Sequence, residues 1–322
     1  MKKTTLLFLL IISFSMSMAQ RILPADKKSI RSEERKMKDV AIQILMGSSA
    51  EEMMKADSSF TRMLVQTLKI KNSYYYPFDS LINISTLYPP DSSFRIFTWQ
   101  MVLDETIVRQ HGAIQMNTPD GSLKLIPLID KSDVIEHPED TITDNTAWIG
   151  AIYYRLLMHE YKGQKYYTLL GFDENNISSN RKYIEVLHFE NGKPIFGGPF
   201  FSFPENPDLP HEPKRFVMEF KKYASPRMNY DEDLNLIVKE HLISETNEPQ
   251  KKYTLIGDGD YEGFRWNQDC WDYVYKVFDQ VTPEGQVPIP TPIRDDSGNI
   301  DDAKLKGREN QATQPAPKKQ KN

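Results

Sequence analysis

The chain has 322 residues, a formal net charge of −5 and hydrophobic residues at 39% of its positions. This apolar content is enough to build the core of one large domain. The mildly acidic charge and the absence of a basic cluster argue against nucleic-acid binding. Because only one cysteine is present, an internal disulfide is excluded and the fold must be stabilised by packing.

The start of the chain has the features of a secretory signal peptide. Two lysines are followed by an apolar run at 6–14, and small residues occupy the −3 and −1 positions of a cleavage site before Gln20. The apolar run is too short to span a bilayer as a helix, and no later segment is a candidate transmembrane helix. We therefore predict a signal peptide at 1–19 and an exported mature chain, either periplasmic or extracellular.

Residues 20–76 are predicted to form a helical N-terminal segment. The stretch 25–46 contains strong helix formers, no Gly or Pro, and apolar residues at helical spacing. Gly47 is suited to end this helix, and Ser48 with Glu51 matches a capping box that would start a second helix. The second helix carries an apolar stripe of Met53, Phe60, Met63, Leu64 and Leu68. We expect this stripe to pack against the following domain rather than to form a partner-binding groove.

Residues 77–281 are predicted to form a large antiparallel β domain. From Phe94 onwards, short runs rich in β-branched and aromatic residues alternate with turn sequences such as Lys162-Gly163-Gln164 and Asn191-Gly192. Such short connections, without a long helical crossover, exclude a doubly wound parallel sheet. We expect an α+β fold with at least ten strands, arranged as packed sheets or as a propeller-like stack.

Residues 282–322 are predicted to form a proline-rich, basic, disordered tail. The segment 287–293 is VPIPTPI, which is typical of a polyproline conformation. Residues 303–322 contain six Lys or Arg against one Glu and few apolar side chains. A segment of this composition cannot bury enough apolar surface to fold alone.

No recognised metal or cofactor motif occurs along the chain. His159-Glu160 and His211-Glu212 begin like a zinc-protease motif, but neither is followed by the second histidine that the motif requires. No nucleophile elbow and no glycine-rich phosphate loop is present. Cys270 is interpreted as a half-buried strand residue, because the neighbouring carboxylates would raise a thiol pKa. We therefore predict no metal or cofactor, and the catalytic residues, if any exist, stay unassigned.

An acidic cluster at 230–235 keeps a hydrolase as an alternative. The sequence YDEDLN places Asp231, Glu232 and Asp233 together, and glycosidases use two carboxylates with separated pKa values. Adjacent acids on one loop do not by themselves provide such a pair. The alternative function is a secreted hydrolase of glycans or peptides, with acids such as Asp231 and Asp233 in a cleft.

The stretch 257–275, GDGDYEGFRWNQDCWDYVY, matches much of a calcium-loop template. Positions 1, 3, 5 and 12 of the template hold Asp258, Asp260, Glu262 and Asp269. Gly263 falls at position 6, but Arg265 brings a positive charge to a position that is normally apolar. The flanking segments are typical of strands, whereas an EF-hand needs helices. We therefore favour a β-hairpin with an acidic turn over a calcium site within 258–269.

Three segments resemble a family of exported proteins from Bacteroidetes. They are KYYTLLGFDENNISSNRKYIEVLHFENGKPIFGGPFF, KRFVMEFKKYASPRMNYDEDLNLIVKEHL and GDGDYEGFRWNQDCWDYV. The chain departs from the family pattern at Gly257, where the family has Pro, and at Lys239-Glu240, where it has Phe-Asp. The resemblance spans about residues 94–278 and implies a lineage and export, but that family has no assigned activity.

The leading interpretation is therefore an exported, non-enzymatic binding or envelope-associated protein. Its expected partner is a protein or a glycan, and nucleic acid is excluded by charge.

Overall fold

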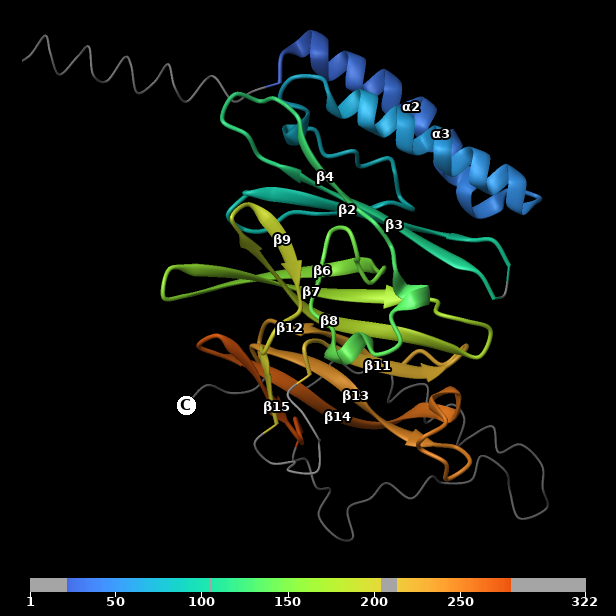
Figure 1. Ribbon diagram of the computed structural model, residues 1–322, viewed down its shortest axis with the longest axis vertical. Helices are drawn as coiled ribbons and strands as arrows, with labels where there is room; N and C mark the ends of the chain where they lie inside the picture. Colours follow the sequence, from blue (N-terminus) through green and yellow to red (C-terminus); the bar gives the residue numbers. More distant parts are fainter. Residues whose placement is uncertain (1–21, 105, 204–212, 279–322) are drawn as a thin grey trace, which may run out of the picture. The chain divides into compact units, whose positions relative to one another are not determined.

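The computed structural model describes residues 22–104, 106–203 and 213–278. These residues belong to one compact unit, in which two helices precede three mainly antiparallel sheets (Figure 1). The predicted α+β fold is confirmed, and it takes the form of packed sheets. The predicted signal peptide at 1–19 and tail at 282–322 lie outside the described residues. No helix in the described part of the chain is both long and apolar enough to cross a membrane.

The two helices, α2 (Pro24–Met46) and α3 (Ala50–Leu68), form a hairpin with a short connection. The apolar residues that we predicted to face the core lie in one cluster, where each is buried or partly buried. Among them are Ile30, Met37, Ala41 and Ile44 of α2, and Phe60, Leu64 and Leu68 of α3. The methionine-rich stripe therefore contributes to a core, as predicted.

The start of α3 lies one residue later than predicted. Ser49, not Ser48, is the N-cap, and its Oγ accepts a hydrogen bond from the N–H of Glu52 at 3.2 Å. The Glu52 carboxylate in turn accepts from the N–H of Ser48 at 2.9 Å. Gly47 ends α2 with φ −58°, outside the left-handed region. A side chain there would lie 2.9 Å from Cγ of Met53, so close packing accounts for glycine at this position.

Ser49→Ala is expected to lower the free energy of unfolding by about 1 kcal/mol, because the N–H of Glu52 would lose its cap. Urea denaturation measures the change. The matched control is Ser58→Ala, an exposed site within α3, where alanine favours the helix slightly. Equal losses in the two variants would contradict the assigned N-cap.

The first sheet has the strand order β1-β2-β3-β4 and is antiparallel throughout. Its strands are β1 (Ser85–Leu87), β2 (Phe94–Val102), β3 (Val108–Met116) and β4 (Lys124–Leu128). Strand β2 is buried on both faces, which explains its almost continuous apolar run. Phe97 and Trp99 join the helix cluster, whereas Phe94 and Ile96 join the cluster shared with the second sheet.

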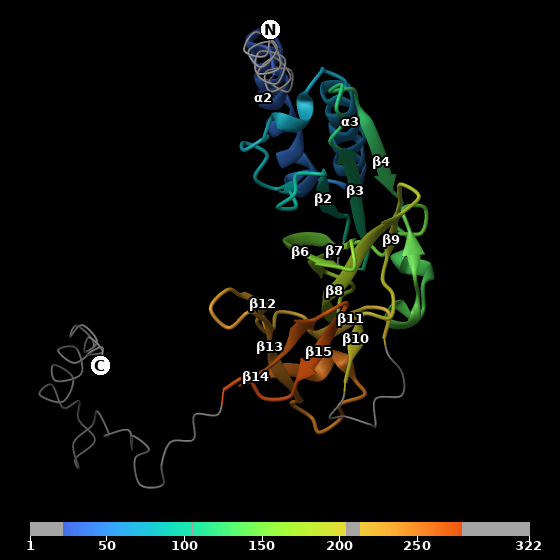
Figure 2. The same cartoon turned by 90° about the vertical axis from the view of Figure 1, so that its left-hand side faces the viewer.

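The second and third sheets follow as further layers (Figure 2). The second contains β5 (Thr143–Asp144), β6 (Ile152–Tyr161), β7 (Gln164–Asp173), β8 (Ser179–Glu190), β9 (Lys193–Phe196) and β11 (Phe216–Lys221). The third contains β10 (Phe201–Ser202), β12 (Met228–Asp231), β13 (Leu236–Ser244), β14 (Leu255–Asn267) and β15 (Cys270–Val274). Strands β10 and β15 pair in parallel, and the other paired strands are antiparallel. Cys270 is half-buried at the start of β15, as predicted.

The connections within the described ranges contain four short 3-10 helices: η1 (Ser73–Tyr75), η2 (Ser132–Val134), η3 (Pro138–Asp140) and η4 (Lys252–Thr254). The segment after η1 is fixed to the first sheet by Arg95, whose side chain is completely buried. Its guanidinium donates to the carbonyl oxygens of Tyr76 at 2.5 Å and Ser73 at 3.0 Å. It also lies over the rings of Phe78 and Phe97, with 5.1 and 4.7 Å to their centroids. Arg95 therefore sets the position of residues 73–78 on β2.

Candidate functional site

The acidic stretch that follows Gly257 lies within strand β14, not in a turn. Glu240 of β13 faces Tyr261, and Leu242 faces Gly257, so residues 258–260 form a bulge opposite a single β13 residue. Gly259 adopts φ +89° in this bulge. The predicted hairpin exists as the pair β14–β15, but its chain reversal occurs at 268–269.

Two acids of the calcium template contact the same histidine. Asp258 Oδ2 lies 2.7 Å from Nδ1 of His241, and Glu262 Oε1 lies 3.8 Å from its Nε2. The buried carboxylate of Glu262 also pairs with Lys239. Burial lowers the pKa of Lys239, and the Glu262 carboxylate opposes that effect. Asp269 lies in the reversal at the far end of β14. Within the described ranges, no group of three His, Cys, Asp or Glu side chains is arranged to hold a metal ion.

The acids of the hydrolase alternative lie in the turn between β12 and β13. Oδ1 of Asp231 accepts hydrogen bonds from the N–H groups of Asp233 and Leu234, both at 3.1 Å. This arrangement is a side-chain-closed turn. Glu232 pairs with Arg155 at the surface, and the Asp233 side chain is exposed. The structure thus accounts for these acids by local turn geometry.

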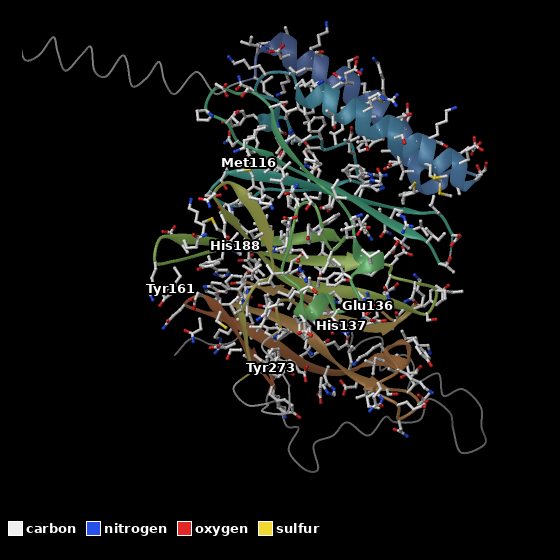
Figure 3. All side chains as sticks on the ribbon, in the orientation of Figure 1. Met116, Glu136, His137, Tyr161, His188 and Tyr273 are labelled. Carbon is white, nitrogen blue, oxygen red and sulfur yellow. The ribbon has the colours of Figure 1, made fainter. Side chains whose placement is uncertain are left out.

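The described histidines make individual contacts. Figure 3 labels His137 and His188, which lie apart, one before η3 and one on β8. His159 stacks on Trp266 with 4.4 Å between ring centroids, and burial lowers its pKa to about 4. His111 stacks on Trp99. His211 lies outside the described residues. Of the two histidine motifs noted in the sequence, only His159-Glu160 lies among the described residues, and its histidine packs against Trp266.

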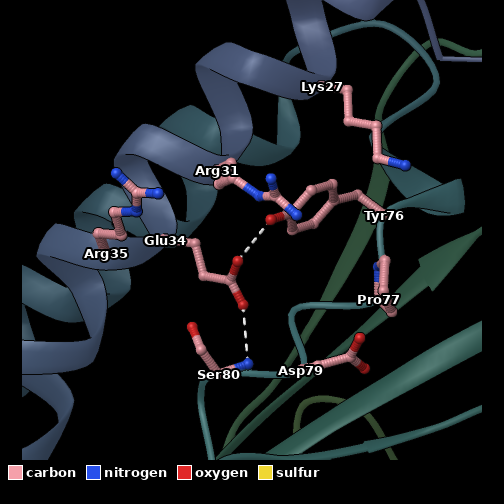
Figure 4. A pocket seen from close by; sticks show the side chains of 8 residues that line it. All are labelled: Lys27, Arg31, Glu34, Arg35, Tyr76, Pro77, Asp79 and Ser80. Atoms are coloured by element: carbon pink, nitrogen blue, oxygen red, sulfur yellow. Dashed lines mark hydrogen bonds between the residues drawn. The ribbon is translucent and has the colours of Figure 1, made fainter.

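A pocket that the sequence did not reveal opens between α2 and residues 76–80 (Figure 4). Its volume is about 360 Å³, and its lining residues are Lys27, Arg31, Glu34, Arg35, Tyr76, Pro77, Asp79 and Ser80. The three cations recur every four residues, so they share one face of α2. The pocket therefore has one cationic wall, supplied by a single helix.

The floor of the pocket is a hydrogen-bonded carboxylate. Glu34 is 6% exposed, and its two oxygens accept from the Tyr76 hydroxyl at 2.5 Å and from the Ser80 N–H at 2.9 Å (Figure 4). Burial and the hydrogen bond to Glu34 raise the pKa of Tyr76 to about 12. The Tyr76 hydroxyl therefore stays a donor at neutral pH, and the floor joins α2 to the segment that Arg95 anchors.

The rim of the pocket is cationic and open to solvent. Lys27, Arg31 and Arg35 are all exposed, and the guanidinium of Arg31 lies beside the Tyr76 ring (Figure 4). Neither Lys27 nor Arg35 forms an ion pair with any residue that the structure describes. Three cations and the two carboxylates of Glu34 and Asp79 give the pocket a formal charge of +1. Such a site attracts an anion.

No family model, curated protein or solved structure matches this chain. The resemblance to exported proteins of Bacteroidetes, which is based on three sequence segments, stays a prediction.

Proposed function

We propose that this chain is an exported binding protein that acts outside the cytoplasm without chemical turnover. The observation that carries the proposal is the pocket beside α2, where a cationic rim surrounds a carboxylate already held by two donors. The two oxygens of Glu34 accept from the Tyr76 hydroxyl and the Ser80 N–H. The carboxylate is therefore held in one position, which suits binding and positioning of a ligand.

The export part of the proposal is supported by the sequence. The signal-peptide features at 1–19 and the resemblance to exported proteins of Bacteroidetes both favour a location in the periplasm or outside the cell. Association with the envelope is part of the same proposal. In these compartments the pocket would meet glycans and proteins rather than nucleotides.

Export can be tested in the cell. We expect the secreted or periplasmic fraction to contain a chain that begins at Gln20, as determined by N-terminal sequencing and mass spectrometry. Ala19→Arg should block cleavage, because position −1 requires a small residue. A chain that retains Met1 and stays in the cytoplasm would refute this part of the proposal.

Binding without turnover can be tested on the mature chain, residues 20–322. We expect saturable binding to members of a panel of glycans and proteins, with every bound ligand recovered intact after prolonged incubation. The hydrolase alternative predicts product formation that the double variant Asp231→Asn/Asp233→Asn abolishes. Product formation of that kind would replace the binding proposal with the hydrolase.

A further inference from the structure

We propose that the pocket beside α2 binds one acidic sugar unit, a hydroxylated ring that carries a single negative charge. The charge would be a uronate carboxylate or a sulfate ester. This inference rests on the proposed binding function and assigns its site and ligand class. Three properties of the pocket favour this ligand: its net charge, the two kinds of hydrogen-bonding group on its walls, and its size.

The net charge selects a monoanion. The pocket carries a formal charge of +1 from its three cations and two carboxylates. A uronate or a sulfate ester balances this charge, and an uncompensated charge in a partly desolvated site is unfavourable. A phosphate monoester carries a charge of about −1.5 to −2 at neutral pH, which exceeds the positive charge of the pocket. A zwitterion has no net charge and would leave the positive charge of the pocket without a counter-charge.

The cationic wall is arranged to hold a planar or tetrahedral oxyanion. Arg31 and Arg35 are one helical turn apart on α2, and Lys27 precedes Arg31 by one turn. A guanidinium binds a carboxylate or a sulfate through two parallel N–H donors. Because Arg35 and Lys27 form no ion pair among the described residues, a ligand would not need to displace an internal partner.

The carboxylates of the pocket require a ligand that also offers hydrogen-bond donors. The carboxylate oxygens of Glu34 and Asp79 are hydrogen-bond acceptors, and Glu34 already uses one site on each oxygen for Tyr76 and Ser80. Its remaining lone pairs, and those of Asp79, can accept from ligand hydroxyl groups. A sugar acid supplies an anion for the arginines and several hydroxyl donors for the carboxylates on one small ring.

The size of the pocket favours a single unit over an extended chain. A volume of about 360 Å³ lies near the lower end of ligand pockets. The exposed ring of Pro77 offers a small apolar surface beside the polar floor. A pocket of this kind accepts the end of a glycan or a free sugar acid, whereas an acidic peptide would require a longer groove.

The test uses isothermal titration of the mature chain with defined probes. We expect galacturonate and galactose 6-sulfate to bind at least tenfold more tightly than galactose, galactose 6-phosphate or alanine. A trigalacturonate that binds like the free acid supports recognition of one unit. A trigalacturonate that binds more than tenfold more tightly contradicts it, because further units would then contact the chain.

Variants assign the binding to the pocket. Arg35→Gln and Arg31→Gln are each expected to weaken galacturonate binding at least tenfold, and Arg35→Lys should cause a smaller loss because charge remains without the planar fork. The matched control is Lys36→Gln, which removes a cation of the same helix that pairs with Glu33 at 2.7 Å. This control should bind as the parent chain does. Unchanged thermal unfolding shows that each variant is folded.

The failures can be told apart. Tight binding of acidic sugars that is insensitive to Arg31 and Arg35 overturns the site but leaves the binding function intact. Preferential binding of galactose 6-phosphate, alanine or an acidic peptide overturns the ligand class. Binding of other glycans or proteins, with no affinity for any acidic sugar, also overturns the ligand class alone. Cleavage of a sugar probe instead overturns the proposed function.

Discussion

Arg215→Met is expected to lower the free energy of unfolding by roughly 3–5 kcal/mol, because it would leave a buried carboxylate without a counter-charge. The Arg215 side chain is fully buried, and its Nε lies 3.0 Å from Oε2 of Glu185, which is also buried. Glu185 accepts a further hydrogen bond from Tyr153, whose hydroxyl accepts from Trp148 Nε1 at 2.8 Å. The guanidinium also donates to the carbonyl oxygen of Thr141 at 2.6 Å. Its loss would therefore affect both the second sheet and the loop before β5.

Urea denaturation of three variants tests this expectation. The double variant Arg215→Met/Glu185→Gln should recover part of the loss, because no charge is then buried while the glutamine can still accept from Tyr153. The surface control is Arg155→Met. Its pair with Glu232 has side chains that are 36% and 76% exposed and should contribute about 0–1 kcal/mol. Equal losses for Arg215→Met and Arg155→Met would contradict the proposed role of the buried pair.

In the parent chain, Asp173 should lower the free energy of unfolding as the pH rises from about 4 to 6. Asp173→Asn is expected to abolish this decrease. Burial raises the pKa of Asp173 from 3.8 to about 6, despite hydrogen bonds from Gln110 at 2.9 Å and from the Asn175 N–H at 3.1 Å. In this interval the folded chain binds more protons than the unfolded chain, so stability falls with increasing pH. A pKa difference of this size corresponds to about 3 kcal/mol.

His159 should have the opposite effect in nearly the same interval. Burial lowers its pKa from 6.5 to about 4, so the unfolded chain binds more protons and stability falls as the pH decreases. The two contributions largely offset each other in the parent chain. Urea midpoints between pH 4 and 7 should show stability rising with pH for Asp173→Asn and falling with pH for His159→Phe. Parallel curves for the parent and both variants would show that neither pKa is shifted.

Local patterns in the sequence predict the helices and most of the strands well. The apolar period of α2 places Ile30, Met37 and Ile44 in the core, where the structure has them. The predicted capping pair lies one residue too early. Two adjacent serines and two adjacent glutamates fit the same motif, and only the backbone conformation at Ser49 decides between the two pairs. Residue identity alone cannot separate such equivalent registers.

The predicted position of the last chain reversal is wrong, because the true position depends on pairing with β13 and not on the local sequence. The sequence around Gly259 has the chemistry of a turn, but β13 pairs with residues 255–257 and 261–264 on either side of it, so the strand continues. The extra residues form a bulge whose acid contacts His241, 17 positions earlier in the chain. A bulge of this kind depends on the pairing partner, which single-sequence patterns do not specify.

The pocket could not be predicted for a similar reason. Lys27, Arg31 and Arg35 form a visible four-residue pattern, but a charged helix face of this kind is usually only solvated. The three cations line a pocket because Glu34 of the same helix accepts a hydrogen bond from Tyr76, 42 residues later in the chain. The acids at 230–235 show the converse, since a conspicuous cluster proves to be a turn closed by Asp231.

The burial of Arg95 has a kinetic consequence for ligand association. Because Arg95 holds the Tyr76 carbonyl from within the first sheet, the wall opposite α2 is already in place before a ligand arrives. Association should therefore follow a single exponential whose rate increases linearly with ligand concentration, without a plateau from a slow rearrangement. Raising the ionic strength should slow that rate, since the cationic rim would attract the ligand less strongly across the solvent.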